Sequence, residues 1–288
     1  MAIKMIDLDK VDDQLTILLH GDSGAGKTFT AATFPRPLFI SPDDEKGWET
    51  LKYMPSSVLY EPDVRPIVWS VSEPRDFVDA YTKLVPLVRE GKVKTIVVDS
   101  LTFYADMFYT AISQNQGDKD GWKVYGQLND HLRRIRIELH KLDCHIIWLA
   151  ITRHPDDAGK VAVPNLKGQQ AVVFPAGCKY VWYMRAVSMP KGMAQHELRT
   201  RKFMNVMARG RDGGRLPDPL VNPSYRSIID ALSRIPTTEF VDTPEEHVVE
   251  QLAEETGVNV PLAKPAAVPP ITRRPGIVKP GIVRPVRR

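Results

Sequence analysis

Cysteine is scarce in this chain: its 288 residues include only Cys144 and Cys178, and both lie in apolar, strand-like segments. Two such residues exclude the disulfide framework of small secreted domains and favour reduced, buried thiols. Long apolar runs are also missing, since stretches such as 146–151 are far too short to cross a bilayer. The charged start, residues 1–7, excludes a signal peptide. We therefore expect a cytoplasmic protein that makes no contact with a membrane.

Acidic residues are absent from the last part of the chain. Residues 261–288 contain seven lysines or arginines and seven prolines, including a degenerate five-residue repeat over 274–286. Residues 1–260 contain the other 32 basic residues and all 35 acidic residues, so their net charge is about −3. So many prolines prevent a packed core. We expect one large domain over 1–235, a helical appendage over 236–260 whose helix begins with a capping box at Thr243, and a disordered basic tail over 261–288.

One glycine-rich stretch fits the phosphate-binding pattern G-x-x-x-x-G-K-[ST] without a mismatch: Gly21, Asp22, Ser23, Gly24, Ala25, Gly26, Lys27 and Thr28. In this pattern backbone N–H groups point at phosphate oxygens, the lysine lies between the β- and γ-phosphates, and the Thr28 hydroxyl binds Mg²⁺. An apolar run precedes the loop and a short helical segment stopped by Pro35 follows it, which is the context that the motif requires. The alternative is a glycine-rich turn that binds nothing. The pattern predicts binding of a nucleoside triphosphate.

Short apolar runs alternate with helical patterns over residues 14–207. We expect parallel strands at 14–19, 37–40, 66–70, 95–100 and 145–151, and helices at about 29–34, 75–89 and 128–139. After Pro155 a long, mostly polar segment extends to Gly177, and strands at 180–185 and 198–207 then form a hairpin at the sheet edge. Alternating strands and helices predict an α/β fold with a mostly parallel sheet flanked by helices.

Asp99 ends a strand at the carboxyl edge of the sheet, where the phosphate loop also emerges, so it is expected to bind Mg²⁺ together with Thr28. The alternative is an aspartate that only caps the next helix. Many motor ATPases place a glutamate after this aspartate, but here the position is Ser100. The base that activates water is therefore expected in the acidic turn 43–45, with Glu45 preferred over Asp43 and Asp44.

The end of the fifth strand, Thr152-Arg153-His154, is a candidate sensor of the γ-phosphate, although a plain strand end explains it nearly as well. Guanine specificity commonly uses an N-K-x-D tetrad. The nearest match, His140-Lys141-Leu142-Asp143, has the wrong first residue and precedes a strand. Adenine is favoured.

In this order, the motifs resemble the RecA/RadA core, and more narrowly the minimal RecA-like ATPases of bacteriophages that are associated with single-strand annealing and recombination. The resemblance covers about residues 14–207. It implies an ATPase that uses ATP and Mg²⁺ in the cytoplasm of a bacterial host. It also implies Lys27 and Thr28 on phosphate and Mg²⁺, Asp99 as the second magnesium ligand, and a base near Glu45.

Such proteins bind single-stranded DNA through two mobile loops, which correspond here to about 113–123 and 155–177. These stretches offer cations for phosphates and side chains for base contacts: Lys119, Trp122, Lys123, Lys160, Lys167, Gln169, Gln170 and Phe174. The resemblance further implies a homo-oligomer in which a neighbouring subunit supplies a cation to the ATP. Arg199, Arg201 and Lys202 are the candidates.

The sequence departs from this family in two ways. The acid after the second strand is displaced by about two residues through Ser41-Pro42, and only 13 residues precede the first strand, where a polymerisation domain would stand. The basic tail suits a DNA-binding arm, a docking peptide for a single-strand-binding protein, or a solubilising extension. Two other functions stay open: a small-molecule kinase with a lid over 209–215, and an ATP-switched scaffold without enzymatic activity.

Overall fold

The protein is described by a computed structural model that covers residues 14–42, 46–116, 121–155, 160–190 and 194–234. All of these residues belong to the first of two units of the chain, residues 1–238. The expected helical appendage and basic tail lie outside the described residues, so the domain boundaries stay a prediction.

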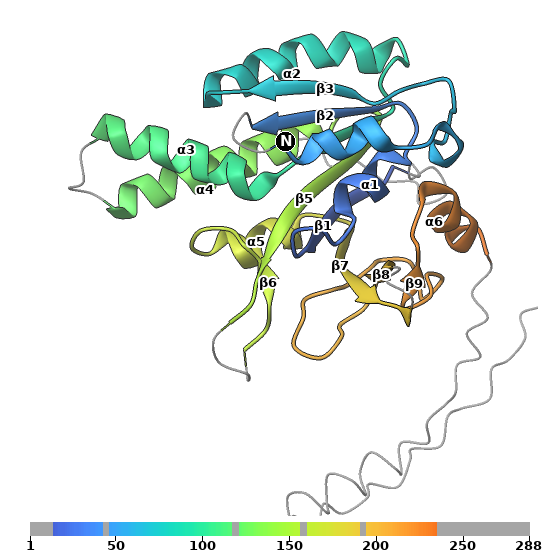
Figure 1. The fold of residues 1–288 in the computed structure, drawn as a ribbon. Coiled ribbons are helices and arrows are strands. Elements are labelled where there is room, and N and C mark those ends of the chain that lie inside the picture. The colour runs from blue at the N-terminus through green and yellow to red at the C-terminus, as the bar shows by residue number, and fades with distance from the viewer. Residues whose placement is uncertain (1–13, 43–45, 117–120, 156–159, 191–193, 235–288) are drawn as a thin grey trace, which may run out of the picture. The chain divides into compact units, whose positions relative to one another are not determined.

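A single sheet organises the described residues (Figure 1). Six strands run parallel in the order β3 (Ile67–Val71), β2 (Pro37–Pro42), β4 (Thr95–Val98), β5 (His145–Arg153), β1 (Thr16–Gly21) and β7 (Tyr180–Ser188). The sheet continues with antiparallel β8 (Ala194–Arg199) and β9 (Leu220–Val221), and β6 (Val163–Pro164) pairs with the end of β5. The predicted α/β class, with a late hairpin next to a parallel sheet, is confirmed.

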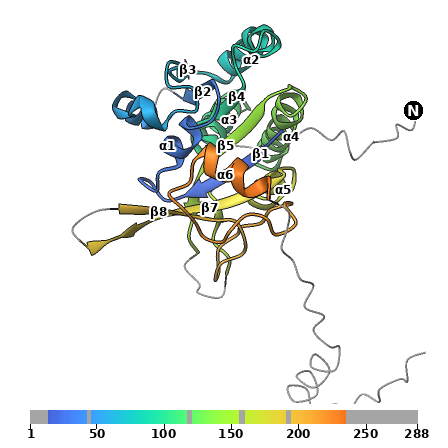
Figure 2. The ribbon, with the colours of Figure 1, turned by 90° about the vertical axis from the view of Figure 1, so that its right-hand side faces the viewer.

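Helices cover both faces of this sheet (Figures 1 and 2). On one face α2 (Pro74–Arg89), α3 (Leu101–Gln116), α4 (Gly121–Leu139) and α5 (Gln170–Ala176) pack over one buried cluster. On the other face α1 (Lys27–Ala32), α6 (Tyr225–Leu232) and two 3₁₀ turns, Gly47–Tyr53 and Ser56–Val58, pack over a second cluster. Both faces of the central strands are therefore shielded from water, which explains why β1, β2, β4 and β5 are mostly buried apolar runs.

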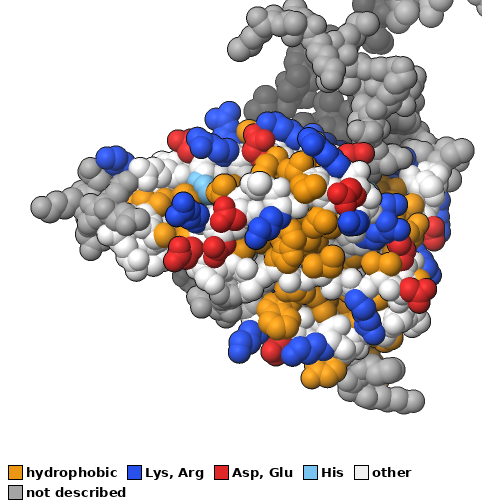
Figure 3. All heavy atoms as spheres, turned by 90° about the horizontal axis from the view of Figure 1, so that it is seen from above, with side chains coloured by type: hydrophobic (Ala, Val, Ile, Leu, Met, Phe, Trp, Pro, Cys, Tyr) orange, Lys and Arg blue, Asp and Glu red, His pale blue; other side chains and the backbone are white. Residues whose placement is uncertain are grey.

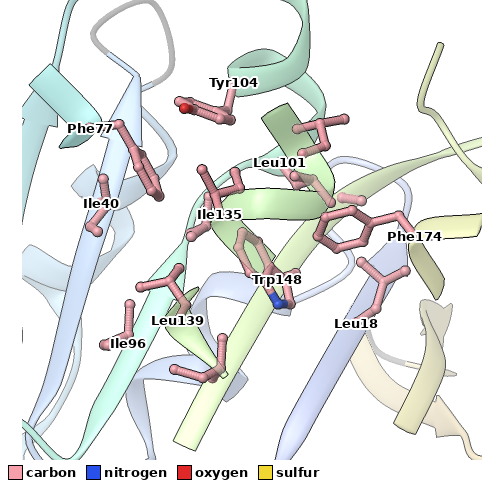
Figure 4. Close-up of a cluster of buried hydrophobic side chains, with 14 of the residues drawn as sticks. Leu18, Ile40, Phe77, Ile96, Leu101, Tyr104, Ile135, Leu139, Trp148 and Phe174 are labelled. Atoms are coloured by element: carbon pink, nitrogen blue, oxygen red, sulfur yellow. The ribbon is translucent and has the colours of Figure 1, made fainter. Parts of the chain in front are cut away.

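The core is built by the two-residue period of the strands. In β5, Trp148 points to the α4 side and its neighbours Ile147 and Leu149 point to the α1 side. Trp148 is fully buried and meets Phe174 edge to face, with ring centroids 5.0 Å apart (Figure 4). Burying a side chain of this size contributes roughly 2–3 kcal/mol. This packing fixes β5 between β1 and β4, and so fixes the edge at which both neighbours end.

Some expected elements differ from the structure. The second strand of the hairpin is Ala194–Arg199, whereas 198–207 was predicted, because Val206 pairs instead with Ala162 in the segment after β5. The segment 155–177 was expected to be a polar loop, but it contains β6 and helix α5, whose Ala171 and Phe174 are buried. Both corrections have one cause: the residues after β5 fold back onto the sheet and bury apolar surface there.

Candidate nucleotide-binding site

The glycine-rich stretch joins the end of β1 to the start of α1, as the motif requires. Gly26 has φ 93°, and a Cβ there would lie 2.8 Å from Nδ1 of His196. A Cβ on Gly21 would collide with the carbonyl oxygen of Met184. Neither position accepts a side chain without movement of its neighbours, so the close packing of the loop against Met184 and His196 requires glycine at both.

Lys27 folds back over the loop that precedes it. Its Nζ donates to the carbonyl oxygens of Gly21 at 2.9 Å and Asp22 at 2.8 Å. The ammonium therefore lies against the first two residues of the loop.

Thr28 and Asp99 are brought together although they are 71 residues apart. The Thr28 hydroxyl donates to Oδ2 of Asp99 at 2.8 Å, and Asp99 is only 3% exposed. The contact exists because β1 and β4 are parallel and end at the same edge, with β5 between them. A hydroxyl and a carboxylate supply the hard oxygen donors that Mg²⁺ prefers, with water and phosphate oxygens completing its shell, so these residues fit the ion. In the described ranges no group of three or more His, Cys, Asp and Glu side chains could hold a metal by itself.

The acidic turn expected to supply the base, Asp43, Asp44 and Glu45, lies outside the described residues, and the role of Glu45 stays a prediction. Ser100, which stands where many motor ATPases have a glutamate, has a structural role: its Oγ accepts from the amide of Phe103 at 3.4 Å in the first turn of α3. Ser100 therefore has no carboxylate to offer at this position.

The end of β5 contacts the phosphate loop at two points. Oγ1 of Thr152 is 2.9 Å from Nδ1 of His20, the residue directly before Gly21, and Nε2 of His154 is 2.8 Å from Oδ1 of Asp22. Burial lowers the pKa of His20 to about 4, with smaller contributions from the nearby Met207 carbonyl, Lys27, His154 and Asp22. Sequence reasoning missed His20, although a histidine inside an apolar run was a visible signal.

A cavity of about 400 Å³ adjoins the phosphate loop, which is in the range of ligand pockets. Its wall combines Gly26 and the α1 residues Phe29 and Thr30 with Val58, His196 and Asn222. The ring of His196 contacts the loop directly, with Nδ1 2.9 Å from the carbonyl oxygen of Ala25. Nothing in the sequence pointed to His196 or Asn222, because only the return of the hairpin brings them to the loop.

The residues expected to contact DNA differ in their exposure to solvent. Gln170 and Phe174 are 4% and 0% exposed, so their assignment to DNA contact is wrong, and Lys119 lies outside the described residues. Lys167 is engaged by Asp106 at 3.0 Å. Trp122 is 93% exposed in the first turn of α4. Lys123, Lys160 and Gln169 are also exposed.

On the face over α2, basic, acidic and hydrophobic side chains are interspersed (Figure 3). Such a mixture gives no field of one sign that would attract a phosphate backbone.

Several arginines expected to act on a nucleotide are engaged within the chain. Arg199 is 3.4 Å from Oε2 of Glu197 and lies over the ring of Phe203. In the segment considered as a kinase lid, Arg209 donates to the carbonyl oxygen of Pro175 at 2.7 Å and Arg215 to that of Leu232 at 2.8 Å. These contacts tie the segment to the domain and argue against a mobile lid.

The phosphate loop between a strand and a helix, together with the Thr28–Asp99 pair at the carboxyl edge of a parallel sheet, defines a P-loop nucleoside triphosphatase fold. A model of the AAA domain family (AAA_24) matches residues 13–211, and the chain belongs to this family. Membership indicates a nucleotide-binding ATPase domain. No curated protein matched the sequence. None of the described helices has the length and apolar character needed to span a membrane.

Proposed function

We propose that this protein hydrolyses ATP with Mg²⁺ and acts on single-stranded DNA in recombination or annealing of the bacteriophage type. The contact between the Thr28 hydroxyl and Asp99, directly after an intact phosphate loop, is the observation that supports ATP hydrolysis most strongly. It brings both expected magnesium ligands to one place at the carboxyl edge of the sheet, next to the phosphate loop.

In this proposal each residue of the site has one task. Lys27 exchanges its two loop carbonyls for β- and γ-phosphate oxygens, and the loop amides bind the remaining phosphate charge. Thr28 and Asp99 hold Mg²⁺, which neutralises charge that develops on the phosphate oxygens. A carboxylate of the turn 43–45, Glu45 by preference, takes the proton of the attacking water.

The cavity beside the loop is the proposed site of the base and ribose. Its position supports this, because Gly26 and Phe29 belong both to the cavity wall and to the loop and helix that hold the phosphates. We assign adenine to it, since the sequence has no tetrad for guanine in the expected place.

The proposed contact with single-stranded DNA uses exposed groups at the sheet edge. Trp122 offers a ring for base stacking, and Lys123 and Lys160 offer charges for phosphates. Stacking contributes about 1–3 kcal/mol per base in such proteins. We further propose a homo-oligomer in which Arg201 or Lys202 approaches the ATP of a neighbour, and a single-strand-binding protein as a partner of the basic tail.

One assay tests the proposal against its alternatives: ATP hydrolysis by the full chain, measured with and without single-stranded DNA. Stimulation by several-fold is the expected result. Transfer of phosphate to a nucleoside monophosphate would instead identify a kinase, and nucleotide binding without turnover would identify a switched scaffold. A chain that binds no ATP would overturn the proposal altogether.

A further inference from the structure

His20 is a buried polar side chain that the proposed chemistry does not use. It is 0% exposed and directly precedes the first glycine of the phosphate loop. Its two ring nitrogens have different partners: Nδ1 is 2.9 Å from Oγ1 of Thr152, and Nε2 is 2.6 Å from the carbonyl oxygen of Met207. One side chain thus joins three segments that are far apart in the sequence.

The hydrogen-bond partners decide which nitrogen has the proton. A carbonyl oxygen can only accept, so Nε2 of His20 must be the donor to Met207. A neutral ring has one N–H, so Nδ1 is an acceptor and the Thr152 hydroxyl donates to it. Since its hydrogen is committed to His20, Thr152 presents only lone pairs to the sheet edge and cannot donate to a phosphate oxygen. Of the three candidate sensors at the end of β5, Arg153 and His154 remain.

Met207 continues the chain of hydrogen bonds. Its amide donates to the carbonyl oxygen of Ala162 at 3.0 Å. The amide of Ala162 in turn donates to the carbonyl oxygen of Asn205 at 2.6 Å. These bonds pair the segment after β5 with the segment after β8, and Val206 and Ala162 form a parallel bridge. The paired segments include exposed Lys160 and Met204, so they present an accessible surface that is linked to the phosphate loop through Met207 and His20.

We propose that His20 is a positioning residue that transmits nucleotide occupancy from the phosphate loop to the paired segments 160–163 and 203–207. The inference rests on the proposed function, since it takes ATP as the ligand and these segments as part of the DNA-contacting surface. Figure 1 shows the geometry that it uses: β1 and β5 lie side by side, and the chain after β5 extends below the sheet beside the chain that follows β8.

A triphosphate acts on this chain of bonds by ordering both of its starting points. Phosphate contacts immobilise the loop that follows His20, and the end of β5 contacts the same loop through His154 and Asp22. When His20 and Thr152 are both immobilised, the hydrogen bond from His20 to the Met207 carbonyl breaks less often. Local opening of the paired segments therefore becomes less frequent. The nucleotide thereby stiffens the DNA-contacting surface before DNA arrives.

Amide hydrogen exchange of the full chain, with and without Mg²⁺ and a nonhydrolysable ATP analogue, tests this inference. The amides of Gly26 to Thr28 report binding, and those of Ala162 and Met207 report transmission. In the wild-type protein we expect the analogue to slow exchange at both sites, by about fivefold or more at Ala162 and Met207, the lower end of typical couplings between sites.

Two substitutions break the chain at different bonds. His20→Gln keeps a donor for Met207 but removes the acceptor for Thr152, whereas His20→Asn keeps an acceptor for Thr152 and loses Met207. In both variants the phosphate-loop amides should still respond, and the response at Ala162 and Met207 should fall below about twofold. Thr152→Val, nearly isosteric, should behave like His20→Gln, and Thr152→Ser should restore the response.

His140→Gln is the matched control. His140 is a partly buried histidine whose pKa burial also lowers to about 4, but its partner is Nε1 of Trp148 in the core, away from the paired segments. It should lose stability and keep the wild-type response. Retention of the response in both His20 variants, or a wild-type protein in which only the phosphate-loop amides respond, would overturn the inference. Failure of the phosphate-loop amides to respond would instead overturn ATP binding.

Discussion

Removal of the Lys27 charge should affect ATP turnover without much effect on the stability of the fold. The Lys27 ammonium donates to two loop carbonyls and belongs to neither buried cluster. We predict that Lys27→Ala lowers ATP turnover by at least about 100-fold, since one well-placed charge in a phosphate site stabilises the transition state by roughly 3 kcal/mol. The free energy of unfolding should change by no more than about 1.5 kcal/mol. Steady-state hydrolysis and urea unfolding measure the two; residual turnover near the wild-type rate would count against the assigned site.

His20 gives the stability of the domain a pH dependence of known sign. Burial lowers its pKa to about 4 in the folded state from 6.5 in the unfolded chain, so between these values the unfolded state binds the extra proton. Stability is therefore lost as pH falls from 6.5 towards 4. Between pH 7 and pH 5 the free energy of unfolding should drop by about 2 kcal/mol more in the wild type than in His20→Gln. Equal drops in urea titrations would show that His20 is not buried as a neutral ring.

At the scale of elements, helix α4 has a buried face and an exposed face whose contributions can be compared. Leu132 is 0% exposed against the sheet, whereas Ile137 on the same helix is 41% exposed. Leu132→Ala should lower the free energy of unfolding by about 2–5 kcal/mol, through lost burial and a residual cavity. Ile137→Ala should change it by less than about 1 kcal/mol. Urea unfolding compares the pair; equal effects would mean that α4 does not pack on the sheet through this face.

Sequence patterns predicted the parallel strands well because burial on both faces leaves continuous apolar runs. The run at 145–151 became β5, which extends only two residues further, to Arg153. The edge was harder: β8 buries only Leu198, so its pattern lacks a clear alternation, and the prediction slipped towards 198–207. Helix α6 was missed because it has only eight residues, although Ser224 caps it.

The same distinction holds for the site. Thr28 and Asp99 could be placed together from sequence, since parallel strands deliver their carboxyl ends to a common edge. The contacts of His196 with Ala25 and of His20 with Met207 could not, because each depends on where the chain after β7 returns to the sheet. That path is decided by tertiary packing, which leaves no periodic signal.

For the whole molecule, the distribution of charge separates the ATPase domain from the end of the chain. Seven cations without an acid stand in residues 261–288, whereas the rest of the chain is close to neutral. Deletion of 261–288 should weaken binding of single-stranded DNA at about 50 mM salt, and the difference should shrink at about 200 mM, because released counterions drive such contacts. Fluorescence anisotropy measures the binding. Basal ATP hydrolysis should be unchanged by the deletion. If the full chain and the shortened chain bind DNA equally well at low salt, the tail does not contribute to DNA binding.

Both cysteines of the chain are buried, and burial raises the pKa of each thiol to about 12. At neutral pH neither forms appreciable thiolate, so maleimide dyes should react slowly with the native protein. A cysteine introduced at an exposed position such as Met204 would then be the one fast-reacting handle, and no native residue would need replacement. A single fluorophore at position 204 would then report on the surface of the paired segments in real time as nucleotide and DNA bind.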